Sequence, residues 1–168
     1  MKNQKGFSLI ELLIVVVIIG IIAAIAIPNL LAARRAANEG SAQSTDRTLH
    51  SAQVTFASTY GNGNYAGGTT YAGGLTDLNT QGLIDSQLAA GQKSGYDYLT
   101  KATDRQVGVS EATFTVGAAP SVASGVSQTG TRKFCIATEG VVRSNNATLT
   151  QFAADGDCDA TNYPDVVQ

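Results

Sequence analysis

An uninterrupted apolar run near the start of the chain limits what this sequence can fold into. Sixteen residues from Leu12 to Ile27 carry no polar side chain, and Pro28 follows them. A helix rises about 1.5 Å per residue, so residues 7–31 would reach roughly 37 Å, whereas the hydrocarbon core of a bilayer is about 30 Å thick. The segment is therefore long enough to span a membrane as a helix.

Glu11 directly precedes this run. A carboxylate in hydrocarbon costs several kcal/mol and needs a partner, but Lys2 and Lys5 belong on the wet cytoplasmic side. Cleavage between Gly6 and Phe7 would create an α-amine with a reference pKa of about 8. That amine would lie about one helical turn from Glu11, so the two charges can pair within one chain or between neighbouring copies.

Residues 5–15, Lys-Gly-Phe-Ser-Leu-Ile-Glu-Leu-Leu-Ile-Val, and Ile-Pro-Asn at 27–29 resemble the prepilin N-terminus. Type IV pilins and type II secretion pseudopilins share this segment. The resemblance implies cleavage after Gly6 by prepilin peptidase, N-methylation of Phe7, and subunit docking through Phe7 and Glu11. Gly20 and Pro28 match positions where the family's helix bends and loses regular hydrogen bonding in the fibre, and both residues weaken a helix interior.

Two other interpretations of the N-terminus remain open. Ala24-Ile25-Ala26 forms an A-x-A site after a basic start, as in a secretory signal peptide. Apolar length alone also permits a permanent single-span anchor. The mature N-terminus separates the three: Ile27 indicates a signal peptide, Met1 an ordinary anchor and Phe7 a pilin.

Length and charge indicate one modest domain beyond the helix. The chain has 168 residues, a net charge of −2 and a pI near 5.2, without the basic footprint of a nucleic-acid-binding protein. We therefore predict a leader at 1–6, a transmembrane and polymerisation helix at 7–31, the amphipathic half of the same helix at 32–60 and a globular head at 61–168.

The amphipathic half carries an apolar stripe at helical spacing: Ala42, Leu49, Ala52, Phe56 and Tyr60. The polar residues between them are expected to face water or a neighbouring molecule: Arg34, Arg35, Glu39, Asp46, Arg47 and Gln53. At a membrane exit, paired arginines are either interfacial anchors or partners of acids on adjacent subunits.

The remainder of the chain predicts a small α+β head. Residues 61–74 are too rich in glycine for regular structure, and 75–91 carry two short helical turns. Alternating patterns predict strands at 96–100, 112–116, 133–137 and 141–143. The expected fold is a long N-terminal helix packed on an antiparallel sheet of about four strands within 96–144, and this order resembles a type IV pilin head.

Cys135 and Cys158 are the two cysteines of a segment expected to face an oxidising compartment, so they predict a disulfide that closes 135–158. A loop of that size contributes about 3 kcal/mol in the chain-entropy model. In type IV pilins a loop of this kind covers the sheet edge.

Enzyme and metal chemistry have little support in the sequence. His50 is the single histidine, and adjacent Ser51 does not share its helix face, so no catalytic residues are assigned and no cofactor is expected. Asp155, Asp157 and Asp159 alternate like calcium ligands, but Ala160 and Val166 occupy the sixth and twelfth positions, where an EF-hand has Gly and Glu. We therefore predict no metal site, and calcium at these three acids remains the alternative.

Together these features predict a non-enzymatic major pilin. It would be held in the inner membrane as a single-pass precursor and then polymerised with copies of itself into a surface pilus. Prepilin peptidase, an assembly platform and an assembly ATPase would be its partners. The alternatives are a major pseudopilin of a type II secretion system and a membrane-anchored binding module that does not polymerise. The sequence does not indicate whether the fibre serves motility, adhesion, DNA uptake or conduction.

Overall fold

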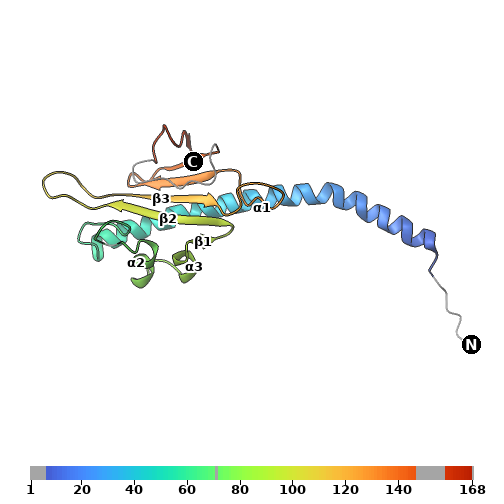
Figure 1. Ribbon diagram of the computed structural model, residues 1–168, viewed down its shortest axis with the longest axis horizontal. Coiled ribbons are helices and arrows are strands. Elements are labelled where there is room, and N and C mark those ends of the chain that lie inside the picture. Colours follow the sequence, from blue (N-terminus) through green and yellow to red (C-terminus); the bar gives the residue numbers. More distant parts are fainter. Residues whose placement is uncertain (1–6, 71, 147–157, 168) are drawn as a thin grey trace, which may run out of the picture. The chain divides into compact units, whose positions relative to one another are not determined.

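A computed structural model describes residues 7–70, 72–146 and 158–167 (Figure 1). The chain divides after Arg34 into two compact units. The first contains the start of helix α1 (Leu9–Thr59), and the second contains the rest of α1 and everything that follows it. The predicted single long helix and α+β class are confirmed.

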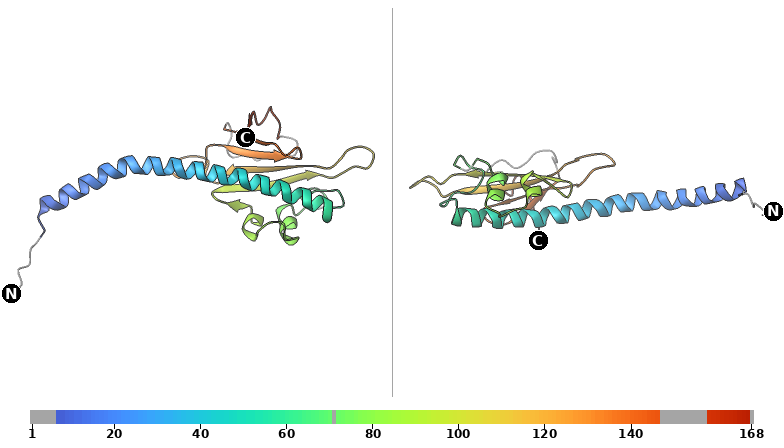
Figure 2. Two further views of the ribbon diagram at one scale, coloured as in Figure 1. Left: turned by 180° about the vertical axis from the view of Figure 1, so that it is seen from behind. Right: turned by 90° about the horizontal axis from the view of Figure 1, so that it is seen from below.

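The sheet contains six antiparallel strands in the order β1-β2-β3-β4-β5-β6. Their bounds are β1 Gln92–Lys93, β2 Tyr96–Thr103, β3 Thr113–Pro120, β4 Lys133–Ala137, β5 Val142–Asn145 and β6 Asp165–Val166. One face of the sheet packs against the second half of α1 (Figure 2). Tyr98, Ala118, Phe134 and Ser144 form one row across β2 to β5, because each is the register partner of the next.

The prediction of about four strands was wrong, because two short edge strands were missed. Ser94 and Gly95 both have positive φ, 50° and 72°, so a two-residue turn folds β1 back onto β2. At the other edge, β6 from the C-terminal tail pairs with β5. Strands of two residues are too short to show alternation in a sequence.

The inner face of α1 also differs from the sequence expectation. Ala42, Leu49 and Phe56 are buried as predicted, but Glu39, Asp46 and Gln53, expected to face water or a neighbour, are buried too. The six residues alternate at spacings of three and four, so they occupy one helix face. The polar series Glu39, Asp46 and Gln53 therefore lies within the apolar stripe.

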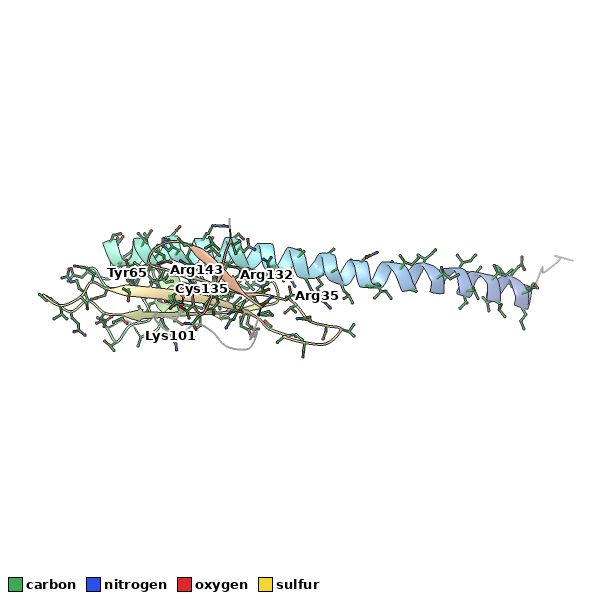
Figure 3. The ribbon with its side chains drawn as sticks, turned by 90° about the horizontal axis from the view of Figure 1, so that it is seen from above. Arg35, Tyr65, Lys101, Arg132, Cys135 and Arg143 are labelled. Carbon is green, nitrogen blue, oxygen red and sulfur yellow. A yellow bond between two sulfur atoms is a disulfide. The ribbon has the colours of Figure 1, made fainter. Side chains whose placement is uncertain are left out.

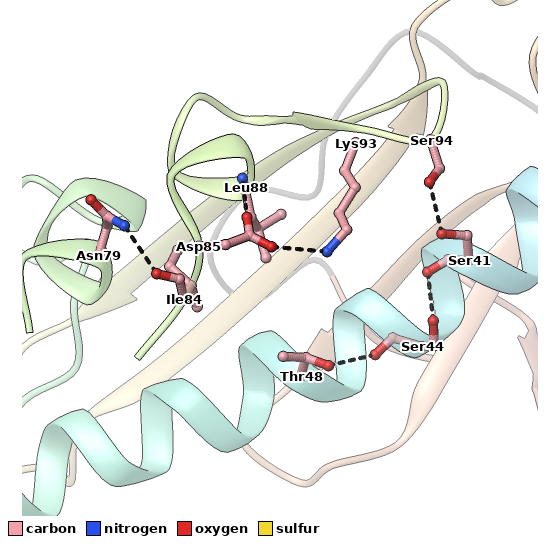
Figure 4. A network of polar contacts seen from close by, with 9 residues as sticks. All are labelled: Ser41, Ser44, Thr48, Asn79, Ile84, Asp85, Leu88, Lys93 and Ser94. Carbon is pink, nitrogen blue, oxygen red and sulfur yellow. Dashed lines mark hydrogen bonds and ion pairs between the residues drawn. The ribbon is translucent and has the colours of Figure 1, made fainter. Parts of the chain in front are cut away.

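The outer face of α1 carries hydroxyl groups that bond to their own helix. Ser44 donates to the Ser41 carbonyl at 2.8 Å, and Thr48 donates to the Ser44 carbonyl at 3.0 Å (Figure 4). Ser51 and Thr55 continue this pattern along the helix. These bonds satisfy the hydroxyls locally and leave a smooth surface of small side chains.

Residues 75–91 form the two predicted helical turns, α2 (Leu75–Thr80) and α3 (Ser86–Ala89). Asp85 caps α3, because its Oδ1 accepts a hydrogen bond from the Leu88 N–H at 2.7 Å (Figure 4). Its other oxygen lies 3.2 Å from Lys93 Nζ.

The predicted disulfide between Cys135 and Cys158 is confirmed. Cys135 belongs to β4 (Figure 3), and Tyr163 of the C-terminal segment packs against the pair. Phe134 and Ile136 belong instead to the main core with α1, because side chains alternate along a strand. The C-terminal segment therefore packs on the face of β4 that α1 leaves open.

Candidate functional site

The first turn of α1 holds a side-chain cap formed by Glu11. Ser8 precedes Leu9, the first helical residue, and Glu11 is the third residue of the helix. The Ser8 N–H donates to Glu11 Oε2 at 3.0 Å. This is the glutamate half of a capping box, the Ser-x-x-Glu pattern that satisfies an otherwise open helix N–H. Ser-Leu-Ile-Glu at 8–11 shows this pattern in the sequence itself, so the cap could have been predicted.

The cap fixes where the charge of Glu11 lies. By accepting from Ser8, the carboxylate is held toward the N-terminal end of the helix, where the helix dipole favours negative charge. Within the described part of the chain, only Oε2 is engaged. The arrangement can therefore receive a cation that approaches the first turn of the helix.

The apolar residues after this turn have no packing of their own. Every large apolar side chain from Phe7 to Leu30 is exposed; Phe7 is 85% exposed and Val15, the least exposed, is 48% exposed. By length and composition α1 can cross a membrane. In its most apolar window of 18 residues, none of the residues is buried. A helix that is apolar on all sides requires lipid or other protein around it.

Gly6, Gly20 and Pro28 are the other residues predicted to act in this segment. Gly6 lies outside the described residues. Gly20 is inside α1, and a Cβ built on it would meet no atom within 4 Å. Pro28 is also inside the helix. Nothing in the first unit opposes the packing of a neighbouring helix at Gly20.

A second polar cluster joins α1 to the connection between β3 and β4, and we call residues 35, 38, 39 and 128–132 the α1 clasp. Arg35 Nε donates to the Gln128 carbonyl at 3.3 Å, and Asn38 Nδ2 donates to the Thr129 carbonyl at 2.9 Å. Arg35, expected to be an interfacial anchor or to pair with a neighbour, thus has an acceptor in its own head. Figure 3 shows Arg35 and Arg132 from this cluster.

Glu39 is the centre of the α1 clasp and is 6% exposed. Its Oε1 accepts from the Thr131 N–H at 2.7 Å and the Thr131 hydroxyl at 2.6 Å. Its Oε2 lies 2.9 Å from Arg132 Nη2. Burial alone raises the pKa of Glu39, but the Thr131 hydrogen bonds and the Arg132 charge outweigh burial and hold that pKa below its usual value.

The other candidate residues are His50 and the three acids considered as calcium ligands. His50 Nε2 lies 3.4 Å from the Thr138 carbonyl, and its ring packs 5.3 Å from that of Phe114. Asp159 accepts from the backbone N–H groups of Thr161 and Asn162, while Asp155 and Asp157 lie outside the described residues. Within the described ranges, no three metal-binding side chains cluster.

Comparisons with known proteins match the N-terminal segment that holds the capping box. Residues 1–27 match the family model described as the prokaryotic N-terminal methylation motif. The chain is 69% identical over 39 residues to the type IV wide pilus major component PilA4 of Thermus thermophilus, which covers 23% of this chain and 30% of that protein.

Two further relatives match in the same way. The type IV major pilin protein PilA of Myxococcus xanthus is 48% identical over 56 residues, which is 33% of this chain and 26% of that protein. A fimbrial protein of Pseudomonas aeruginosa is 79% identical over 29 residues, which is 17% of this chain and 19% of that protein. The chain thus spans less than a third of each of these curated relatives. No solved structure gives a significant match.

Proposed function

We propose that this chain, whose start carries the prokaryotic N-terminal methylation motif, is the major structural subunit of a type IV pilus. The observation that carries the proposal is the pairing of an apolar helical segment, whose large side chains are exposed, with a carboxylate held at its first turn. A helix surface of this kind is satisfied by lipid before assembly and by copies of itself afterwards. The relatives named as pilus components support the same role.

Maturation would prepare the docking groups. Prepilin peptidase would cleave between Gly6 and Phe7 in the inner membrane, and the new amine of Phe7 would be methylated. A secondary amine at this position stays mostly protonated near neutral pH, as an α-amine does. The leader 1–6 would be lost, and the helix from residue 7 to 31 would remain in the bilayer until assembly.

Docking would join two copies through opposite charges in a low-dielectric environment. The Phe7 amine of an incoming subunit would approach Glu11 of a neighbour, whose carboxylate already points toward the N-terminal end of its helix. Each charge lowers the cost of burying the other. Gly20 and Pro28 would allow the helix to bend or unwind locally within the fibre.

The head would form the outer surface of the fibre. Its disulfide between Cys135 and Cys158 supports a pilus over a type II secretion pseudopilus, for which a tightly bound calcium would be the expected device. The force for assembly would come from an ATPase acting through a membrane platform. We propose a structural role without catalysis for the chain itself.

Purification of surface fibres tests this proposal. We expect this chain to be their bulk component, with a mature N-terminus at N-methylated Phe7 and the Cys135–Cys158 disulfide intact by mass spectrometry. A control strain without the prepilin peptidase should retain the full precursor in the membrane and lack fibres. A mature protein that starts at Ile27 or Met1, or fibres without this chain, would refute the proposal.

A further inference from the structure

The buried face of α1 carries a polar residue every seven positions: Glu39, Asp46 and Gln53. These three residues differ in whether their side chains are hydrogen-bonded. Gln53 Nε2 donates to the Ala66 carbonyl and to Thr100 Oγ1, each at 2.7 Å, and its Oε1 accepts from the Ala66 N–H at 2.9 Å. Glu39 is satisfied by the α1 clasp. Glu39 and Gln53, the first and last residues of the series, therefore have hydrogen-bond partners within the head.

Asp46, in the middle of the series, has none. Its exposed fraction is 0%, and neither carboxylate oxygen accepts a hydrogen bond from any residue in the described ranges. A buried polar group without a hydrogen bond is rare in folded proteins, and each instance requires a reason. Asp46 is therefore the least expected group in the core of the head.

Among the described residues, no strand of the sheet places a cation beside Asp46. On the face toward α1, strand β2 presents the phenols of Tyr96 and Tyr98. In the row of Tyr98, the next three strands present Ala118, Phe134 and Ser144. The Tyr98 hydroxyl lies beside Thr45 without a well-aligned hydrogen bond, and the buried Ser144 hydroxyl is also unsatisfied. Burial raises the pKa of Tyr98, and the proximity of Asp46 raises it further.

The charged groups on α1 itself do not compensate either. Arg47 is exposed, Glu39 is neutralised by Arg132, and His50, one turn further on, is turned to the Thr138 carbonyl. Burial raises the pKa of Asp46 well above its ordinary value, and the charge of Arg47 lowers it only in part. A neutral carboxyl is the form that this packing accommodates.

We propose that Asp46 is a proton-operated switch in the seam between α1 and the sheet, packed as a neutral acid and loosened when it loses its proton. The proposal concerns the chain's own head, so it does not depend on the pilus function. Asp46 binds its proton more tightly in the folded state than in the unfolded state. Its contribution to stability is therefore complete below the unfolded pKa, about 3.9, and is lost as the pH rises toward the folded pKa.

The size of the pH effect on stability follows from the binding of one proton, because only the Asp46 carboxyl changes its protonation in this proposal. Between the two pKa values the folding equilibrium constant falls by up to tenfold for each pH unit, and above the folded pKa it no longer changes through this group. The medium around a surface-exposed head would therefore set how firmly α1 and the sheet are joined, with the tighter state in acid.

Unfolding of the full mature chain in detergent micelles tests the switch. Near-UV circular dichroism would follow denaturant unfolding between about pH 4 and pH 8. We expect Asp46→Asn to become more stable relative to the wild type as the pH rises, by up to tenfold in the folding constant per pH unit. Asp165→Asn, which removes an exposed carboxylate, should follow the wild-type profile. Parallel profiles for Asp46→Asn and the wild type would overturn the proposal.

A second measurement needs no variant. Infrared spectra of the folded wild type at about pH 6, where exposed carboxyl groups are ionised, should retain the carbonyl band of one neutral carboxyl. That band should disappear only at a higher pH, at the folded pKa of Asp46, above which stability no longer changes through this group. Its absence from the folded protein at about pH 6 would contradict the proposal even if Asp46→Asn failed to fold.

Discussion

The two halves of α1 share one helix but differ in where their partners are found. Residues 12–27 are apolar on all sides and their large side chains are exposed, whereas residues 35–59 bury one face, including Leu49 and Phe56, in the core of the head. The second half therefore completes its packing within its own chain. The first half has no such packing, so its partners must be lipid or other molecules.

The glutamates of the two halves show the same difference. Glu39 has its two oxygens engaged by Thr131 and Arg132, while Glu11 is exposed and engaged only by the Ser8 N–H in the described part of the chain. A charge with its bonds completed within the chain fixes the fold. Glu11 keeps one carboxylate oxygen without a hydrogen bond among the described residues, so this oxygen can accept a bond from a further partner.

Truncation of one large side chain in each half of α1 should show the difference between the halves most clearly, as a difference in the stability of the head. Phe56→Ala should destabilise the head by about 3–5 kcal/mol, because the side chain is fully buried and leaves a cavity. Ile18→Ala removes an exposed side chain and should leave head stability within about 0.5 kcal/mol. Denaturant unfolding in micelles measures both, and equal losses would show that the two halves are not independent.

The Glu39 ion pair predicts a smaller, pH-dependent effect. Glu39→Gln should lower stability near neutral pH by about 1–3 kcal/mol, since it weakens hydrogen bonds to a charged group. The pKa of Glu39 is lower in the folded state, so its contribution is present above the unfolded pKa and is lost as the pH falls through the folded pKa. The difference between the wild type and Glu39→Gln should therefore begin to shrink below about pH 4 and disappear only below the folded pKa. A constant difference at all pH values would be inconsistent with the ion pair.

Most of the architecture followed from local sequence patterns, and the errors arose where a strand is too short to show a pattern or where a distant contact decides. Strands β2 to β5 were predicted because alternation extends over several residues, and the disulfide because there are only two cysteines. The edge strands β1 and β6 depend on pairing of two residues, which leaves no periodic signal.

The buried polar series was the clearest error in the site. Glu39, Asp46 and Gln53 were expected to face water or a neighbour because polar residues usually do, although their sevenfold spacing places them on the face of Ala42, Leu49 and Phe56. Burial of Glu39 requires Thr131 and Arg132, more than ninety positions away, and no local pattern reveals such a contact. The capping box at Ser8 and Glu11, by contrast, was visible in four adjacent letters.

Replacement of Glu11 by glutamine tests the central claim most directly, because glutamine also serves at this position of a capping box but carries no charge. With head stability and membrane insertion unchanged, Glu11→Gln should abolish or severely reduce surface fibres, and the exposed head variant Glu111→Gln should assemble normally. Quantification of fibres and of their content of this chain provides the measurement. Fibres of normal number and length, built from Glu11→Gln at the usual share, would contradict assembly through this charge.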